Sequence, residues 1–252
     1  MSFVLAVANQ KGGVGKTTTV HSLGAALAER GRQVLLVDLD PQACLTYSLG
    51  LTPGELPGSL HGVLVNQQPA EEIVTKVGDL HLLPSTIDLA GAEIFLMTKT
   101  GREYALARAL SPLAGRYDTV LIDCAPSLGI LTINGLTAAN QVLIPLQCET
   151  LSHRGVGQLL ETVEDVRSFT NPDIKVAGVV ATMFDGRTRL AQETVASVTG
   201  QYQLEVFEPP VPKSVRVAEA PGDGKSVLEH APNSPASHAY RQLAALIDER
   251  LR

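Results

Sequence analysis

The stretch A-N-Q-K-G-G-V-G-K-T-T-T, residues 8–19, is a glycine-rich loop placed between two segments with regular apolar patterns. Residues 3–9 before the loop form a short apolar run typical of a fully buried strand, and residues 17–31 after it repeat apolar side chains at helical spacing. Another apolar run follows at residues 33–40. A strand, a crossover helix and a second strand in close succession form a βαβ unit, which predicts a parallel sheet covered by helices.

The alternation of apolar strands and helical patterns continues to the end of the chain. Residues 52–113 are less regular, and we expect short helices there around one strand at residues 80–84. We predict a single domain over residues 1–252 with a doubly wound, mostly parallel α/β sheet and helices on both faces. The further strands are predicted at residues 117–126, 140–147, 174–184 and 203–209, and the further helices at 151–169, 190–200 and 236–251.

Composition and charge narrow the class of protein. The chain is 44% hydrophobic and 18% charged, and it contains no run of about 18 apolar residues that would span a bilayer. Because no basic-flanked apolar leader is present either, we expect a cytoplasmic protein that does not bind membrane. The net charge of −6 argues against a surface coated in basic charge, so any binding of nucleic acid depends on a local patch.

The three cysteines, Cys44, Cys124 and Cys148, are widely spaced within apolar segments. That placement predicts reduced, buried thiols rather than a disulfide framework or an iron–sulfur cluster.

The glycine loop predicts a phosphate-binding site. Between a buried strand and a helix, backbone N–H groups free of side chains point inward, and the helix N-terminus adds partial positive charge. Gly15, Lys16 and Thr17 fill the last positions of the usual G-x-x-x-x-G-K-[ST] pattern, but Gln10 stands where its first glycine belongs. The alternative, that the glycines serve only a tight turn, is disfavoured by the flanking strand and helix.

The remaining sequence, K-G-G-V-G-K-T-T, resembles the deviant Walker A motif of the ParA/MinD family of P-loop ATPases. The resemblance implies that Lys16 holds the phosphates of its own ATP, whereas Lys11 reaches across a homodimer to the ATP of the partner subunit. Burying the charge of ATP between two subunits requires such compensating cations. The residues expected to hold nucleotide are Lys11, Gly12, Gly13, Val14, Gly15, Lys16, Thr17, Thr18, Met183, Pro212 and Ser214.

Three carboxylates follow predicted strands, at the edge of the sheet where the loop lies. Asp38 and Asp40 end one strand, and Asp123 ends another. The family resemblance assigns Asp40 to the attacking water in a first switch region and Asp123 to Mg²⁺ through water. Thr17 then supplies a hydroxyl ligand, with Asp38 beside it or its metal. Alternatively, each aspartate caps a helix or a turn.

Segments beyond the loop resemble the partition ATPases of the ParA/Soj branch, among them VDLDPQ, LIDCAPSLG and IPLQCE. That resemblance implies weak intrinsic ATP hydrolysis, an ATP-dependent dimer on nonspecific double-stranded DNA, association with the nucleoid, and stimulation by a ParB-type protein. The candidate DNA-binding cations are Arg187, Arg189, Lys213 and Arg216, with Arg154, Lys175 and Lys225 as further candidates. Ser214 replaces an asparagine common in relatives, which leaves its contact with nucleotide open.

Three other functions remain open. A MinD-type ATPase would bind membrane through a C-terminal amphipathic helix, here residues 239–252, although their polar face is of mixed charge rather than uniformly basic. A metabolic synthetase of the same fold would use ATP to activate a small carboxylate. An orphan positioning ATPase would carry a cargo other than DNA.

Overall fold

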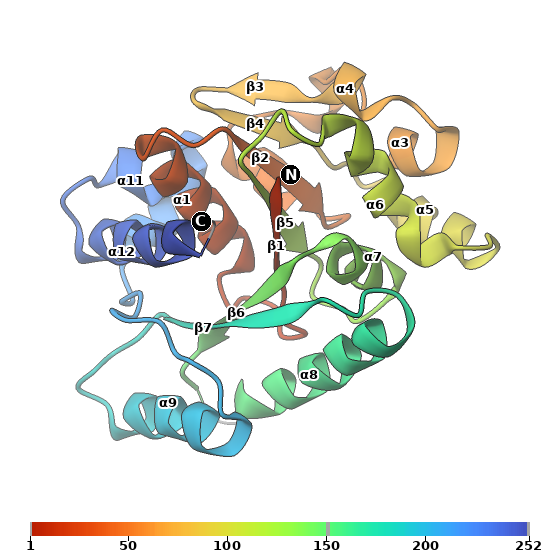
Figure 1. Cartoon of the computed structure of the whole chain (residues 1–252). Coiled ribbons are helices and arrows are strands. Elements are labelled where there is room, and N and C mark those ends of the chain that lie inside the picture. The colour runs from red at the N-terminus through yellow and green to blue at the C-terminus, as the bar shows by residue number, and fades with distance from the viewer. Residues whose placement is uncertain (1, 150–151, 251–252) are drawn as a thin grey trace.

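The computed structural model describes residues 2–149 and 152–250 and shows a twisted sheet with helices on both sides (Figure 1). The strands are β1 (Phe3–Val7), β2 (Val34–Leu39), β3 (Thr75–Val77), β4 (Leu80–Leu83), β5 (Thr119–Cys124), β6 (Gln141–Gln147) and β7 (Lys175–Thr182). The α-helices are α1 (Lys16–Glu29), α2 (Cys44–Ser48), α3 (Leu60–Asn66), α4 (Ala70–Ile73), α5 (Leu89–Met97), α6 (Ala105–Leu110), α7 (Ile130–Ala138), α8 (Ser152–Phe169), α9 (Arg189–Tyr202), α10 (Val215–Glu219), α11 (Val227–His230) and α12 (Pro235–Glu249). Short 3₁₀ helices are η1 (Pro53–Glu55), η2 (Arg102–Tyr104), η3 (Ser111–Leu113) and η4 (Ala220–Asp223).

The seven strands lie in the order β3-β4-β2-β5-β1-β6-β7, and all neighbouring pairs are parallel except β3 with β4. The predicted doubly wound, mostly parallel sheet is therefore confirmed. In the register of β2 with β5, Asp38 lies opposite Asp123. The carboxyl ends of these two strands thus bring both acids to one edge of the sheet, next to the loop that leaves β1.

Alternating residues of each central strand enter two separate apolar cores. In β1, Leu5 and Val7 belong to one core, while Ala6 belongs to the other. Helices α1, α11 and α12 cover the first face and α5 to α8 cover the second (Figure 1). Because both faces are buried, these strands are continuous apolar runs, which is the pattern that made them predictable.

Two parts of the sheet differ from the prediction. Residues 203–209 form no regular strand; they meet β7 through one isolated bridge, in which Val179 N–H donates to Glu205 O and Phe207 N–H donates to Val179 O, both at 2.8 Å. Pro209, the last residue of this segment, and Pro210 after it lack the N–H groups that would continue the ladder, and the next bond to β7 comes from the Val211 N–H to Ala181 O at 2.8 Å. The antiparallel strand β3 was not predicted, because three residues are too few to show a period.

The C-terminal helix α12 packs against α1. Its apolar stripe is covered: Leu243 and Ile247 are buried, and Leu246 packs against the same core. The buried Asp248 accepts hydrogen bonds from Arg30 and Arg32, at 3.0 and 2.6 Å, which fix the last turn. The predicted helices at 151–169 and 236–251 are present over their described parts, and Leu151 and Leu251 lie outside the described residues. No helix in the described ranges has the length and apolar character needed to span a bilayer.

Candidate functional site

The loop between β1 and α1 has the backbone shape that its glycines allow. Gly13 and Gly15 adopt φ of +74° and +83°, a left-handed conformation that side-chain-bearing residues rarely adopt. Helix α1 starts at Lys16, directly after Gly15, so its unpaired N–H groups face the loop. The loop and helix together form a nest for an anion such as a phosphate group.

Lys16 lies almost fully buried among negative groups. Its Nζ donates to the backbone oxygen of Lys11 at 3.1 Å, so the side chain curls over its own loop. Burial lowers the pKa of this amine, and the nearby carboxylates of Asp123 and Asp40 oppose that shift. A cation held in this way is preorganised for a ligand that brings further negative charge.

The end of strand β7 holds the phosphate loop through a hydrogen bond. Thr182, the last residue of β7, donates its hydroxyl hydrogen to the Val14 carbonyl at 2.8 Å. Met183 follows with φ of +49°, and Phe184 pairs with Pro212 in an isolated bridge. Met183, which was predicted to hold nucleotide, therefore follows directly on the residue that contacts the phosphate loop, and Pro212 lies beside the same segment. Sequence reasoning missed Thr182, whose only signal is its position at a strand end.

The side chain of Ser214 has a local role in the structure. Its hydroxyl caps helix α10 by accepting from the Arg216 N–H at 3.3 Å. A capping serine at this position does not require a nucleotide to explain it.

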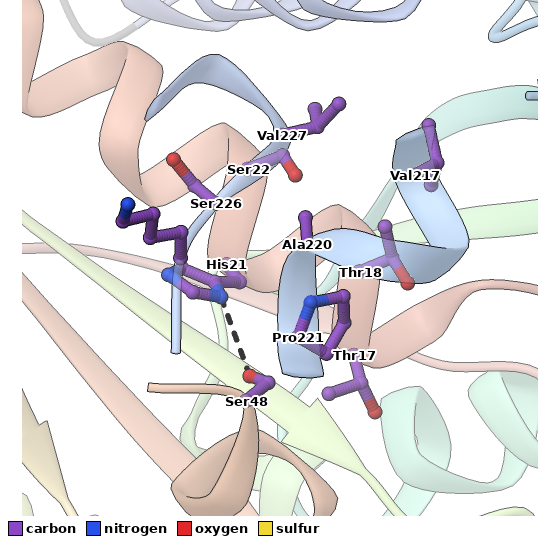
Figure 2. A pocket seen from close by; sticks show the side chains of 11 residues that line it. Thr17, Thr18, His21, Ser22, Ser48, Val217, Ala220, Pro221, Ser226 and Val227 are labelled. Carbon is purple, nitrogen blue, oxygen red and sulfur yellow. Dashed lines mark hydrogen bonds between the residues drawn. The ribbon is translucent and has the colours of Figure 1, made fainter. Parts of the chain in front are cut away.

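A small cavity lies beside the first turn of α1 (Figure 2). Its volume is about 20 Å³, room for about one water molecule, so an adenine base does not fit there. His21 in this cavity contacts the Ser48 hydroxyl through Nδ1 at 3.3 Å, and Ser48 donates its own hydrogen to Leu45 O. The cavity is lined by Thr17, Thr18, His21, Ser22, Ser48, Val217, Ala220, Pro221, Lys225, Ser226 and Val227.

The three predicted carboxylates gather at the carboxyl ends of β2 and β5, and all three are buried. Asp38 accepts from the N–H and the hydroxyl of Thr46 at 2.8 and 2.7 Å. Burial raises the pKa of Asp38 to about 7. Asp40 accepts from the Gln42 N–H at 2.9 Å, which is the turn-capping geometry expected as the alternative role.

Asp123 makes no hydrogen bond to the described residues through either carboxylate oxygen. Both of its carboxylate oxygens are buried, and neither has a hydrogen-bond partner of regular geometry, although the Thr17 side chain is close enough to lower its pKa. Burial is the larger influence and, with the charge of Asp38, raises the pKa of Asp123 well above its usual range. A buried carboxylate without a partner calls for a ligand, and a hydrated divalent cation beside the Thr17 hydroxyl would satisfy it.

These residues suit Mg²⁺ better than a metal that needs a protein cage. Within residues 2–149 and 152–250, no three His, Cys, Asp or Glu side chains are grouped so as to hold a metal ion. Mg²⁺ keeps several of its waters and binds through few protein oxygens plus phosphates, so a hydroxyl and one carboxylate through water are sufficient. The bonds that Asp38 makes to Thr46 direct its carboxylate to α2 and to the turn after β2.

Lys11, at the outer end of the loop, makes an ion pair within its own chain. Its Nζ lies 3.1 Å from Glu149 Oε2, and its backbone N–H donates to Asn9 Oδ1 at 3.0 Å. Asn9 in turn donates from Nδ2 to the Pro145 carbonyl in β6 at 2.7 Å. The backbone of Lys11 is therefore fixed to the sheet through Asn9, while its side-chain amine lies at the protein surface.

The predicted basic residues lie on neighbouring segments, and their arginines are paired with acids. The Lys213 N–H donates to Phe184 O at 3.2 Å, which joins the Pro212–Arg216 segment to the 184–189 loop. Arg187, Arg189 and Arg216 form exposed ion pairs with Asp185, Glu193 and Glu219, at 2.8, 2.6 and 3.2 Å. These acids therefore reduce the net positive charge of the patch on a single chain. The side chain of Arg154 lies outside the described residues.

The cysteines differ in exposure. Cys124 is buried under Gly135, where an added Cβ would lie only 2.9 Å from its Sγ, and burial raises the pKa of its thiol. Cys148 is half-buried, and burial raises its pKa to about 11. Cys44 is exposed, contrary to the prediction, because α2 begins with this residue at the rim of the carboxylate site.

Comparisons with known proteins agree with this geometry. Residues 2–176 match the family model described as an AAA domain. The chain is 46% identical over 248 residues to the "Chromosome-partitioning ATPase Soj" of Thermus thermophilus, covering 98% of this chain and 96% of that protein. It is 42% identical over 249 residues to the "Chromosome partitioning protein ParA" of Myxococcus xanthus, covering 98% and 88%. A similar solved structure is described as cobyrinic acid a,c-diamide synthase from Mycobacterium smegmatis, with bound ADP and magnesium. Its sequence is 50% identical to this chain and the TM-score is 0.89. The match covers 99% of this chain and 95% of that chain.

Proposed function

The chain belongs to the ParA/Soj family of partition ATPases, and on that premise we propose that it is one P-loop ATPase domain that segregates DNA. In this proposal ATP and Mg²⁺ bind at the glycine loop and join two copies of the chain into a dimer. The dimer binds double-stranded DNA without sequence preference on the nucleoid, hydrolyses ATP slowly, and is released when a ParB-type protein stimulates hydrolysis. The observation that carries the proposal is the preorganised glycine loop with its buried Lys16, near Asp123, whose two buried carboxylate oxygens have no hydrogen-bond partner among the described residues.

The residues of this chain supply positioning and charge rather than covalent chemistry, which is what phosphoryl transfer needs. Lys16 and the loop N–H groups hold the phosphates, and Thr17 with Asp123 holds hydrated Mg²⁺, which neutralises the charge that develops on them. Asp40 orients the attacking water. The short distance along the chain between Asp38 and Asp40 allows the first to shape the turn that presents the second, and the Asp40 N–H donates to Asp38 Oδ1 at 3.3 Å.

The proposed dimer uses Lys11. In a single chain this cation is paired with Glu149, and the pair is partly exposed, so the lysine can exchange its partner at small cost. The terminal phosphate of a nucleotide bound by the partner subunit carries more charge than one carboxylate. ATP therefore favours the dimer, and ADP, which lacks that phosphate, does not.

DNA binding is proposed for the patch formed by Arg187, Arg189, Lys213 and Arg216. Because acids of the same chain partly neutralise these arginines, one copy should bind weakly, and two copies joined by ATP double the number of phosphate contacts. This dependence on dimerisation would let ATP control the release of DNA.

The experiment that tests the function measures ATP turnover in four conditions: alone, with duplex DNA, with DNA and a ParB-type protein, and with cobyrinic acid and an amide donor. We expect turnover to rise with DNA and the ParB-type protein together. The last condition tests the activity named for the Mycobacterium smegmatis structure, and a rise there alone would assign this chain to amide synthesis. Pelleting with anionic liposomes tests the MinD-type alternative, which the packing of the α12 stripe disfavours.

A further inference from the structure

A buried hydrogen-bond network joins Asp38 and Asp40 to two hydroxyl residues, Thr46 and Ser85. Thr46 donates to Asp38 Oδ2 from both its N–H and its hydroxyl, at 2.8 and 2.7 Å. The same hydroxyl oxygen accepts from the Ser85 N–H at 3.1 Å. The Ser85 hydroxyl donates to the Asp40 backbone carbonyl at 2.8 Å, which closes the network around the turn that follows β2.

The network draws on three separate parts of the fold. Asp38 lies at the end of β2, Thr46 is in α2, and Ser85 lies two residues after β4, the neighbour of β2 in the sheet. All three side chains are completely buried, and Asp40 is 8% exposed. Water cannot replace bonds that are this deeply buried, so the turn is held in one arrangement by bonds on both of its sides.

Asp40 itself has one carboxylate oxygen free. Its Oδ1 accepts from the Gln42 N–H at 2.9 Å, and its backbone carbonyl accepts from Ala43 as well as from Ser85. Among the described residues, Oδ2 accepts no hydrogen bond. The main chain of Asp40 is thus immobilised, while one oxygen remains available to a water molecule.

We propose that Thr46 and Ser85 are positioning residues that hold Asp40 in place for ATP hydrolysis. This inference rests on the proposed function, in which Asp40 orients the attacking water. Thr46 acts through Asp38 and through Ser85, and Ser85 acts directly on the Asp40 carbonyl. Neither residue touches the nucleotide in this account, so their loss should reduce turnover and leave nucleotide affinity nearly unchanged.

The test compares Thr46→Val, which removes the hydroxyl and keeps the shape, with Thr46→Ser, which keeps the hydroxyl. We expect Thr46→Val to lower kcat by about 10- to 100-fold, because a shift of about 1 Å in a positioned group costs up to about that much. ATP affinity measured by calorimetry should stay within about threefold, since this loss is not one of ground-state binding. Thr46→Ser should restore kcat to within about threefold of wild type.

A second pair of variants protects the test against simple misfolding. Ser85→Ala removes a single hydrogen bond, the one to the Asp40 backbone carbonyl, and it should also lower kcat. Ser237→Ala is the control, because it removes a fully buried hydroxyl that bonds Val227 O and Ala231 O in a different part of the fold. Ser237→Ala should lower the melting temperature without changing kcat.

A separate readout distinguishes positioning from loss of stability. If Thr46 acts through Asp40, Thr46→Val should accumulate an ATP-bound dimer on a sizing column, as Asp40→Ala should. A variant that is merely destabilised would not form a longer-lived dimer. Wild-type kcat in both Thr46→Val and Ser85→Ala, with Asp40→Ala inactive, would overturn the positioning role alone. Equal turnover in wild type and Asp40→Ala would instead overturn the proposed role of Asp40.

Discussion

Lys11 Nζ lies 3.1 Å from Glu149 Oε2 of the same chain, so the outer cation of the loop is paired when no partner subunit is present. The two side chains are 40% and 55% exposed. An ion pair this accessible contributes about 0 to 1 kcal/mol, which a buried phosphate can outweigh. Glu149 therefore acts as a weak competitor for the lysine that we propose to cross the dimer.

Glu149→Gln tests that competition. Removing the carboxylate should tighten the ATP-dependent dimer by at most about 30-fold, because each of the two subunits loses an ion pair worth up to about 1 kcal/mol. Analytical ultracentrifugation with ATP and Mg²⁺ measures the dimerisation constant, and Lys11→Ala, which should remain monomeric, is the matched control. A tenfold or greater weakening in Glu149→Gln would mean that the carboxylate itself contributes to the dimer.

Lys16→Ala should weaken nucleotide binding severely. Lys16 is the buried cation of the loop, and its amine already approaches the loop carbonyl of Lys11. Losing one charge-assisted contact in a buried site costs about 2 to 5 kcal/mol, or at least about 30-fold in affinity. Calorimetry with ATP and with ADP measures the loss. ATP affinity equal to that of wild type would remove Lys16 from the phosphate site.

Arg216→Glu and Glu219→Gln should shift DNA binding in opposite directions. The two side chains form an exposed pair at 3.2 Å, so the glutamate partly neutralises the arginine. Arg216→Glu should weaken retention of duplex DNA by about tenfold and lower its salt dependence, whereas Glu219→Gln should tighten binding a few-fold. Mobility shifts at several salt concentrations provide the measurement, and dimerisation should be unchanged in both variants. If neither variant alters the shift, Arg216 does not contact DNA.

Acid should destabilise the nucleotide-free chain through His21. Burial lowers the pKa of His21 to about 4, against the smaller opposing influence of Glu229. Between pH 4 and the ordinary value of about 6.5, the unfolded chain binds more protons than the folded one, so the free energy of unfolding falls as the pH falls. The expected loss from this group is about 2 kcal/mol between pH 7 and pH 5.

Urea unfolding at these two pH values checks the assignment. His21→Asn, which has no titrating ring, should lose less stability on acidification than wild type by about 2 kcal/mol. The same substitution at the exposed His238 is the control and should leave the acid loss unchanged. An identical acid loss in wild type and His21→Asn would show that His21 is not the responsible group.

The fold could be predicted to a large extent from the sequence because its strands are buried on both faces. Continuous apolar runs such as those of β1, β2 and β5 can be recognised without knowing which strands pair, and the glycine loop lies directly between β1 and helix α1. The segment at 203–209 was misassigned because its apolar alternation resembles a strand, whereas Pro209 and Pro210 interrupt its pairing with β7.

The site was predictable only where one short stretch of chain contains it. Ser85 lies 45 residues from Asp40, and Thr182 lies 168 residues from Val14, yet each makes a bond of 2.8 Å to its partner. Single threonines and serines are common in any sequence, and nothing local distinguishes the one that folding brings to a loop. The acid partners of Arg187, Arg189 and Arg216 lie close in sequence, so the charge patterning at i, i+3 and i, i+4 could have indicated the last two pairs.

In the proposed dimer, Lys11 of each subunit neutralises the ATP held by the other. A crystal structure of the Asp40→Ala chain with ATP and Mg²⁺ would show this contact. We expect a symmetric dimer in which each Lys11 has left Glu149 and lies within hydrogen-bonding distance of the terminal phosphate bound by the opposite subunit. A nucleotide-bound structure in which Lys11 still pairs with Glu149 of its own chain would rule out the proposed role of Lys11 in the dimer.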